Sequence, residues 1–153
     1  MTKGRDRAPW HDAAGRARWR ATLDGLAARY NRGELLHTDP VLFLHRSDAP
    51  LELERIGLVA SGLAFGGVPQ ILRSVEAALR MAGHLEDPAD IAAALRGLRH
   101  RWATGEDVAV VLAGARTVQR RRGSLEAAFL AHDDGGPDYT AALAGLRTDL
   151  LDA

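Results

Sequence analysis

Residues 52–76 have the sequence ELERIGLVASGLAFGGVPQILRSVE. From 56 to 65 every side chain is apolar or small, Gly66-Gly67 interrupts the run, and an apolar stripe with i, i+3, i+4, i+7 spacing follows. A helix that is apolar on all sides is typically buried on all sides. We therefore predict a central buried helix over residues 54–66, followed by a tight turn and an amphipathic helix over residues 68–82.

Helical signals continue on both sides of this hairpin. Apolar stripes and capping residues predict five further helices, around residues 16–30, 91–102, 108–118, 125–129 and 139–150. Residues 34–50 lack this period, and we interpret Val41–Leu44 as an apolar anchor because no second strand is available to pair with it. The predicted fold class is all-α: a single helical domain of about seven helices over residues 16–153, after a mobile basic segment at residues 1–15.

Composition narrows the class of protein. Apolar residues make up 46% of the 153, which favours a globular domain over a disordered chain. No apolar run approaches the roughly 20 residues that a membrane-spanning helix needs, so we expect no membrane partner. The absence of cysteine excludes disulfides and zinc–thiolate sites. We expect a cytoplasmic protein.

Positive charge is concentrated rather than abundant, because the net charge is zero. Of the 20 basic residues 19 are arginine, and Lys3 is the one lysine. Exposed arginine clusters can bind nucleic-acid phosphates. A solvated face with compensation of a helix dipole is the equally weighted alternative, as is a compositional bias. The nucleic-acid-binding candidates are Arg96, Arg99, Arg101, Arg116, Arg120, Arg121 and Arg122.

Several motifs together resemble a known family. They are Leu26 with Tyr30, Asp39-Pro40, Phe43 with Arg46, Glu54, Gly57, Ala60 through Gly66, Gln70-Ile71, Arg101-Trp102, and Gly123–Glu126 with Phe129. This combination resembles a bacterial family of conserved hypothetical proteins, domain-of-unknown-function family 2400, over residues 26–129. The chain departs from it at Gly67, where family members often carry a basic residue.

The resemblance implies a glycosylase-like helical core and an association with nucleic acid. Longer family members resemble the helix-hairpin-helix DNA glycosylases in a later segment that this sequence lacks. We therefore expect a chain truncated at the C-terminus relative to the family and without catalysis at this length. Lysine-based lyase chemistry is also disfavoured, because Lys3 is the sole lysine and lies near the N-terminus.

The remaining candidates have ordinary structural explanations. Gly66-Gly67 could offer backbone N–H groups to an anion at the start of the next helix, but a tight turn is the favoured interpretation. Glu52 and Glu54 either compensate a helix dipole or, for Glu54, orient a polar group in the core. The histidines show no metal-ligand spacing, so we expect no metal and no cofactor.

Two functions from different classes remain open. The leading one is an uncharacterised helical protein that associates with DNA, without catalysis at this length. The alternative is an interaction module that completes its core with a partner chain or a second copy. The last predicted helix favours the alternative, because its apolar stripe of Tyr139, Leu143, Leu146 and Leu150 needs a cover.

Overall fold

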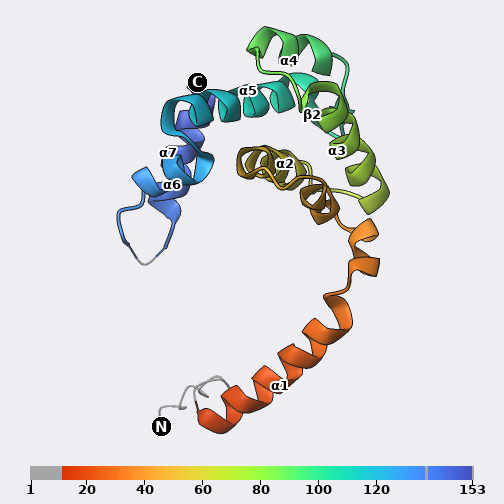
Figure 1. Cartoon of the computed structure of the whole chain (residues 1–153), viewed down its shortest axis with the longest axis vertical. Coiled ribbons are helices and arrows are strands. Elements are labelled where there is room, and N and C mark those ends of the chain that lie inside the picture. The colour runs from red at the N-terminus through yellow and green to blue at the C-terminus, as the bar shows by residue number, and fades with distance from the viewer. Residues whose placement is uncertain (1–11, 137, 153) are drawn as a thin grey trace, which may run out of the picture. The chain divides into compact units, whose positions relative to one another are not determined.

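The computed structural model describes residues 12–136 and 138–152. Helices dominate the described chain, and the strands amount to one two-stranded hairpin, so the all-α class is confirmed. The chain divides into two compact units at His37/Thr38 (Figure 1). Lys3 and most of the predicted basic N-terminal segment lie outside the described residues.

The first unit consists of helix α1, Ala13–Tyr30, and the short 3-10 helix η1, Gly33–Thr38, whose last residue opens the second unit. The Asp12 side chain caps α1 by accepting a hydrogen bond from the Gly15 N–H group. The predicted stripe of Trp19, Leu23, Leu26 and Tyr30 is helical, and these side chains are largely exposed.

The second unit begins with the 3-10 helix η2, Pro40–Arg46, and helices α2, Pro50–Gly62, and α3, Val68–Ala82. Phe43 of η2 is almost fully buried against α2 and α3, which confirms the predicted apolar anchor. Helix α2 ends four residues earlier than predicted and buries one face rather than all sides. Ile56, Val59 and Ala60 face the core, whereas Leu51 and Ser61 are exposed.

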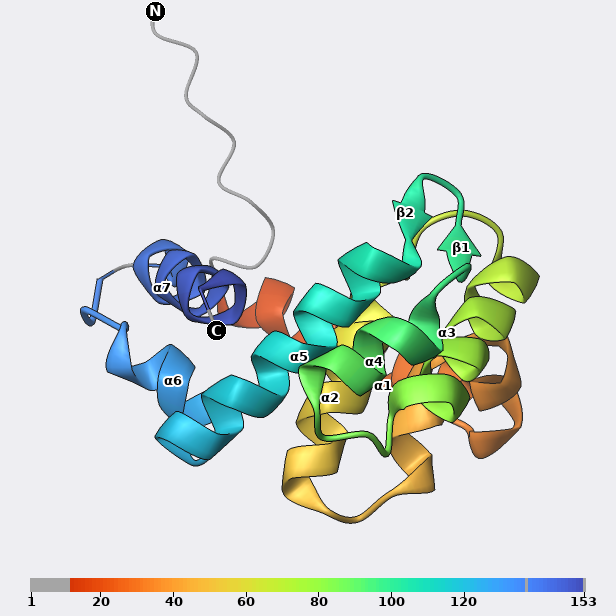
Figure 2. The ribbon, with the colours of Figure 1, turned by 90° about the horizontal axis from the view of Figure 1, so that it is seen from above.

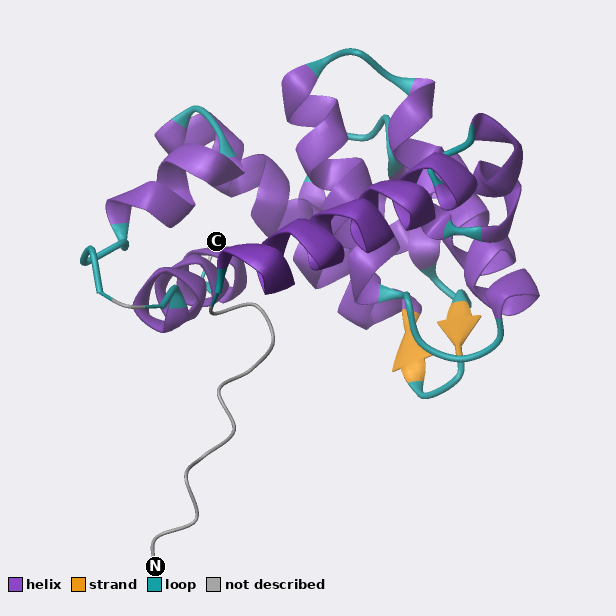
Figure 3. Ribbon diagram, turned by 90° about the horizontal axis from the view of Figure 1, so that it is seen from below, coloured by secondary structure: helices purple, strands orange, loops and turns teal. Residues whose placement is uncertain are grey.

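Helix α4, Pro88–Leu95, is shorter than the sequence indicates. Gly97 adopts a φ of 88°, a left-handed conformation that ends the helix. A hairpin follows where the sequence predicted that the helix would continue through Leu98 to Trp102. Its strands are β1, Arg99–His100, and β2, Ala103–Thr104, paired antiparallel with Arg99 opposite Thr104. Figure 3 shows the hairpin projecting from the helices.

Helix α5, Gly105–Arg122, connects the two ends of the second unit (Figure 1). It packs on α2 and α4, and on the last helices α6, Leu125–Ala131, and α7, Thr140–Leu151. Gly114 makes the α5–α7 contact close, because a Cβ atom there would collide with the Leu150 carbonyl group. Two apolar cores result, a larger one under α2–α5 and a smaller one between α5, α6 and α7.

Candidate nucleic-acid interface and the buried polar network

The hairpin before α5 presents two side chains at its tip, Arg101 and Trp102. Arg101 has a φ of 54°, the one positive φ outside glycine among the described residues. Such a conformation costs a non-glycine residue about 1–2 kcal/mol and persists where the surroundings impose it. The capping box at the start of α5 fixes the other side of the turn, since Thr104 and Asp107 exchange side-chain to backbone hydrogen bonds.

His100 anchors the hairpin to the core. Its ring is 1% exposed and makes two hydrogen bonds, one with the Ser74 hydroxyl and one with the Phe65 carbonyl, each 2.9 Å long. A carbonyl oxygen can only accept, so Nε2 carries a proton and donates to Phe65. These bonds tie the hairpin to α3 and to the turn between α2 and α3, which passes beside it in Figure 2.

The Trp102 side chain is exposed to solvent and stacks on a second aromatic ring. Its ring stacks on Phe65 with centroids 4.8 Å apart and 15° between the planes, and Phe65 in turn meets His100 edge-on. Trp102 is nevertheless 74% exposed. A cavity of about 140 Å³ adjoins both rings, and Asp107 is the one charged side chain in its otherwise apolar wall. The tip therefore offers a flat, open aromatic surface held in a fixed position.

Three of the predicted arginines belong to the segment that carries this surface. Arg96, Arg99 and Arg101 are all exposed, and residues 96–104 contain no acidic side chain. Arg101 also extends over the predicted anion site, because a Cβ atom on Gly66 would lie 2.9 Å from its Cδ atom. The structure thus brings together two features that the sequence offered separately, the arginines of the hairpin and the glycine turn.

The Gly66-Gly67 turn has few backbone donors of its own. Pro69 in the first turn of α3 lacks an N–H group, and the Gln70 N–H donates back to the Gly67 carbonyl. Gly66 has a φ of 107°, so the turn itself requires glycine there. An anion bound at this turn would depend mainly on Arg101, and the backbone anion site stays a prediction.

Arg116 is separated from the other predicted arginines by burial. It is 5% exposed, and its guanidinium group donates to the Glu86 carboxylate and, over 2.6 Å, to the Gly83 carbonyl. From this position it supports the loop after α3 and does not belong to a surface. Its burial was not foreseeable from the arginine spacing, since both acceptors lie about 30 residues away along the chain.

The last arginines of α5 lie at the opposite end of the helix from the hairpin. Arg120, Arg121 and Arg122 are exposed next to the terminal carbonyl groups of α5, which favours cations there. Arg122 also pairs with Asp149 of α7 over 3.2 Å. The seven predicted arginines therefore form two exposed groups of three, one at each end of α5, plus one buried member.

Glu54 connects α2 to the start of α6. Its carboxylate accepts hydrogen bonds from the N–H groups of Leu125 and Glu126, 2.8 and 2.9 Å long. Glu54 therefore compensates a helix N-terminus, as one interpretation predicted, but it is the N-terminus of α6 and not that of α2. It also contacts a polar side chain, that of Gln119, as the other interpretation predicted. Ser124 completes the α6 cap by accepting from the Ala127 N–H group.

Gln119 extends this polar network inward. Its amide donates to Glu54 and to the Leu51 carbonyl, each over 2.8 Å, and accepts from Arg55 over 2.6 Å. Burial raises the pKa of the Glu54 carboxyl, whereas the two backbone N–H groups, the Gln119 amide and the Arg55 charge lower it. Burial is the largest single effect, but the lowering effects together outweigh it, so the pKa of Glu54 lies below its ordinary value and the carboxylate is ionised near neutral pH.

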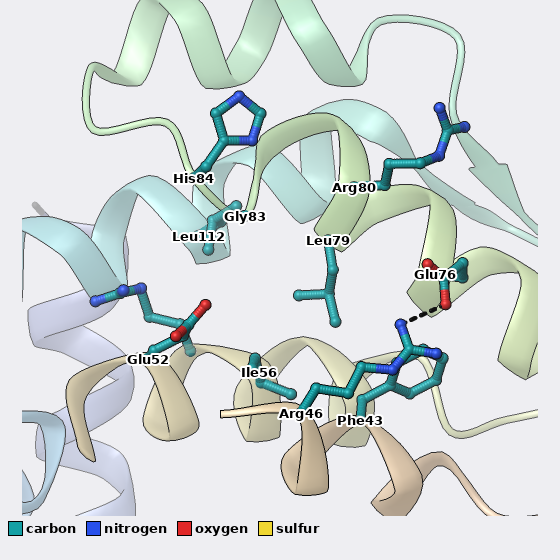
Figure 4. A pocket seen from close by; sticks show the side chains of 11 residues that line it. Phe43, Arg46, Glu52, Ile56, Glu76, Leu79, Arg80, Gly83, His84 and Leu112 are labelled. Carbon is teal, nitrogen blue, oxygen red and sulfur yellow. Dashed lines mark hydrogen bonds and ion pairs between the residues drawn. The ribbon is translucent and has the colours of Figure 1, made fainter. Parts of the chain in front are cut away.

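A second cavity lies between η2, α2 and α3, with a volume of about 320 Å³ (Figure 4). Ile56, Leu79 and Leu112 contribute apolar walls, and an ion pair of 2.6 Å joins Arg46 to Glu76 at one end. Figure 4 shows Glu52 and His84 toward the other end. Charges of both signs line this cavity, so its walls do not select an anion or a cation.

Two further properties of the described residues concern metal ions and membranes. Across residues 12–136 and 138–152, no group of three or more histidine, aspartate or glutamate side chains could hold a metal ion. No helix in the same part of the chain is long and apolar enough to cross a membrane. Sequence reasoning did not identify His100 or Trp102 as parts of a site, and the only signal available was their place between arginines.

Comparison with known proteins gives one match. The sequence profile of domain-of-unknown-function family 2400, described as a protein of unknown function, matches residues 39–152. This range covers nearly all of the second compact unit and includes the hairpin and the polar network. No curated protein and no solved structure matches the chain.

Proposed function

This chain is a member of domain-of-unknown-function family 2400, and we propose that it associates with nucleic acid through the surface at the β1–β2 hairpin. The observation that carries the proposal is that three exposed arginines and an exposed tryptophan lie within residues 96–102, in and just before one anchored hairpin. Lysine and arginine side chains supply most of the affinity for phosphates. The stretch 96–104 offers such charges without a competing carboxylate.

The hairpin is a better candidate than the C-terminal end of α5. Arg122 is engaged by Asp149, and Arg120 donates to Thr117. Residues 124–152 carry six acidic side chains against Arg147 alone, which would repel a polyanion approaching α6 and α7. The relation to the helix-hairpin-helix glycosylases and the expected lack of catalysis at this length stay predictions.

Two variants with equal changes in charge test the proposal. One replaces Arg96, Arg99 and Arg101 by Gln; the other replaces Arg120, Arg121 and Arg122 by Gln. Fluorescence anisotropy with a labelled oligonucleotide at two salt concentrations should show at least tenfold weaker binding for the hairpin variant. Each phosphate contact removed should also flatten the salt slope by about 0.7–0.9. The control variant should bind nearly as well as the parent.

Two results would overturn the proposal. If the parent shows no salt-dependent binding even at low salt, there is no nucleic-acid association to explain. If both variants lose affinity equally, the hairpin has no special part in binding, and attraction by the overall charge is sufficient.

One observation favours the alternative of an interaction module. Tyr139, the N-cap residue of α7, and Leu143 and Leu151 on the helix are about half exposed or more, while Leu146 and Leu150 cover the smaller core. Exposed apolar side chains in a row favour association with a second copy or a partner chain. Light scattering over a wide concentration range distinguishes this alternative, since a monodisperse monomer would contradict self-association.

A further inference from the structure

We infer that Trp102 is a stacking platform for an unpaired base, so that the hairpin surface selects single-stranded or locally unpaired nucleic acid over a duplex. The inference rests on the proposed nucleic-acid association and adds the class of ligand. In a duplex each base is stacked between its neighbours and its face is not accessible. A single strand exposes these faces, and aromatic side chains bind them without regard to sequence.

The environment of Trp102 suits a flat aromatic ring. One face of the indole lies on Phe65, and the 74% exposure of the side chain leaves the rest of its surface open. Leu58, Leu63 and Val111 line the adjoining cavity of about 140 Å³. Such apolar walls disfavour a phosphate or an ammonium group and accept an uncharged ring.

The charges around Trp102 orient the ligand. Arg99 and Arg101 are exposed on the same hairpin as Trp102, whereas Asp107, in the first turn of α5, lies in the wall of the cavity. The sugar–phosphate backbone is therefore attracted to the hairpin edge and repelled from the α5 edge. The aromatic face for the base and the charged edge for the phosphate thus lie on different sides of one surface. A peptide with a single apolar side chain would need the aromatic face alone.

The platform exists before binding. The His100 hydrogen bonds to Ser74 and Phe65 hold the strand that precedes the tip, and Phe65 itself supports the indole. Stacking on Trp102 then needs no rearrangement of the hairpin. Because a rigid aromatic surface loses little freedom on contact, most of the stacking free energy is retained as affinity.

Three ligands and two variants test the inference. The ligands are a labelled DNA strand of mixed sequence, its duplex, and an abasic strand of equal length, which keeps the phosphates but has no bases. We expect the parent to bind the normal strand more tightly than the other two. Trp102→Leu should weaken binding of the normal strand at least about fivefold and leave duplex and abasic binding unchanged. Trp102→Phe, which keeps a ring, should bind between the two.

The outcomes separate the inference from the function it rests on. If the parent binds all three ligands equally and Trp102→Leu changes nothing, stacking is overturned while the association with nucleic acid stands. If the parent binds none of them, the proposed function fails and the inference fails with it. The melting temperature of Trp102→Leu should match that of the parent, because the side chain is exposed; a large drop would point to a role in folding and overturn the inference.

Discussion

At the hairpin before α5, Arg99 and Arg101 lie in solvent beside an exposed tryptophan, whereas Arg116, in the second half of the same helix, is 5% exposed and holds a carboxylate and a carbonyl group. In the sequence, residues 96–104 and residues 116–122 look alike, because each stretch contains several arginines close together. They differ in what the side chain contacts: within the described residues Arg99 and Arg101 make no side-chain hydrogen bond or ion pair, while Glu86 and Gly83 approach Arg116 from the loop after α3.

This difference shows that a run of arginines in a sequence does not define a surface. Arg116 shares the inward face of α5 with Leu112 and Gln119, so the helix period places it in the core. A charge can remain in such a position when hydrogen bonds and an ion pair compensate its lost hydration. The hairpin arginines have no structural task of this kind, which leaves them available to a ligand.

The largest effect is expected where the buried arginine is removed. Arg116→Met should lower the free energy of unfolding by about 1–3 kcal/mol, because the Gly83 carbonyl loses its donor. Glu86 is 67% exposed, so its own lost pairing contributes little. Urea denaturation measures the change. Arg121→Met, an exposed position on the same helix, is the matched control and should unfold like the parent.

A medium effect is expected at Glu54. Glu54→Gln should cost about 1–2 kcal/mol near neutral pH, because an amide is a weaker acceptor for the Leu125 and Glu126 N–H groups than a carboxylate. The matched control is Glu52→Gln, an exposed acid in the same helix.

The cost should also depend on pH. The folded-state pKa of Glu54 is lowered, so its contribution is complete above the ordinary value of 4.5 and is lost as the pH falls through the folded-state pKa. The stability difference between parent and Glu54→Gln should therefore narrow below about pH 4.5. A difference that stays constant from pH 7 to pH 3 would contradict this role for the carboxylate.

The smallest effect on stability is expected at the hairpin tip, and it has the opposite sign. Arg101→Gly removes the cost of a positive φ, so stability should stay equal or rise by up to about 1 kcal/mol. Binding of nucleic acid should nevertheless weaken. Arg99→Gly is the control, since the same substitution in a strand with ordinary geometry should destabilise by about 0.5–1 kcal/mol. If Arg101→Gly is the less stable of the two, the tip is not strained.

Local signals in the sequence predicted the helices well. Asp87 before Pro88, Thr104 with Asp107, and Ser124 all cap helices, and each is a residue type that marks a helix start in a sequence. These motifs act within one turn of a helix, so they can be recognised without knowledge of the rest of the fold. Membership of the family was likewise predictable, because its motifs are spread over much of the chain.

Features that depend on distant residues were not predictable. The hairpin has two-residue strands, too short to show an alternating pattern, and the stripe of Leu98 and Trp102 suggested a longer helix. The burial of Arg116 depends on a loop 30 residues earlier, and Glu54 caps a helix that begins 71 residues later. The sequence identified two parts of the candidate site, the arginines and the Gly66-Gly67 turn, but it did not identify Trp102.

The anchoring of His100 has a consequence for the timing of binding. A loop that orders only on meeting its ligand delays association and adds a temperature-dependent entropy loss. Here that ordering is completed during folding, when His100 takes its place between Ser74 and the Phe65 carbonyl. A strand reaching the tip would meet a finished surface, so its capture would depend on diffusion and electrostatic attraction rather than on waiting for the protein to change shape.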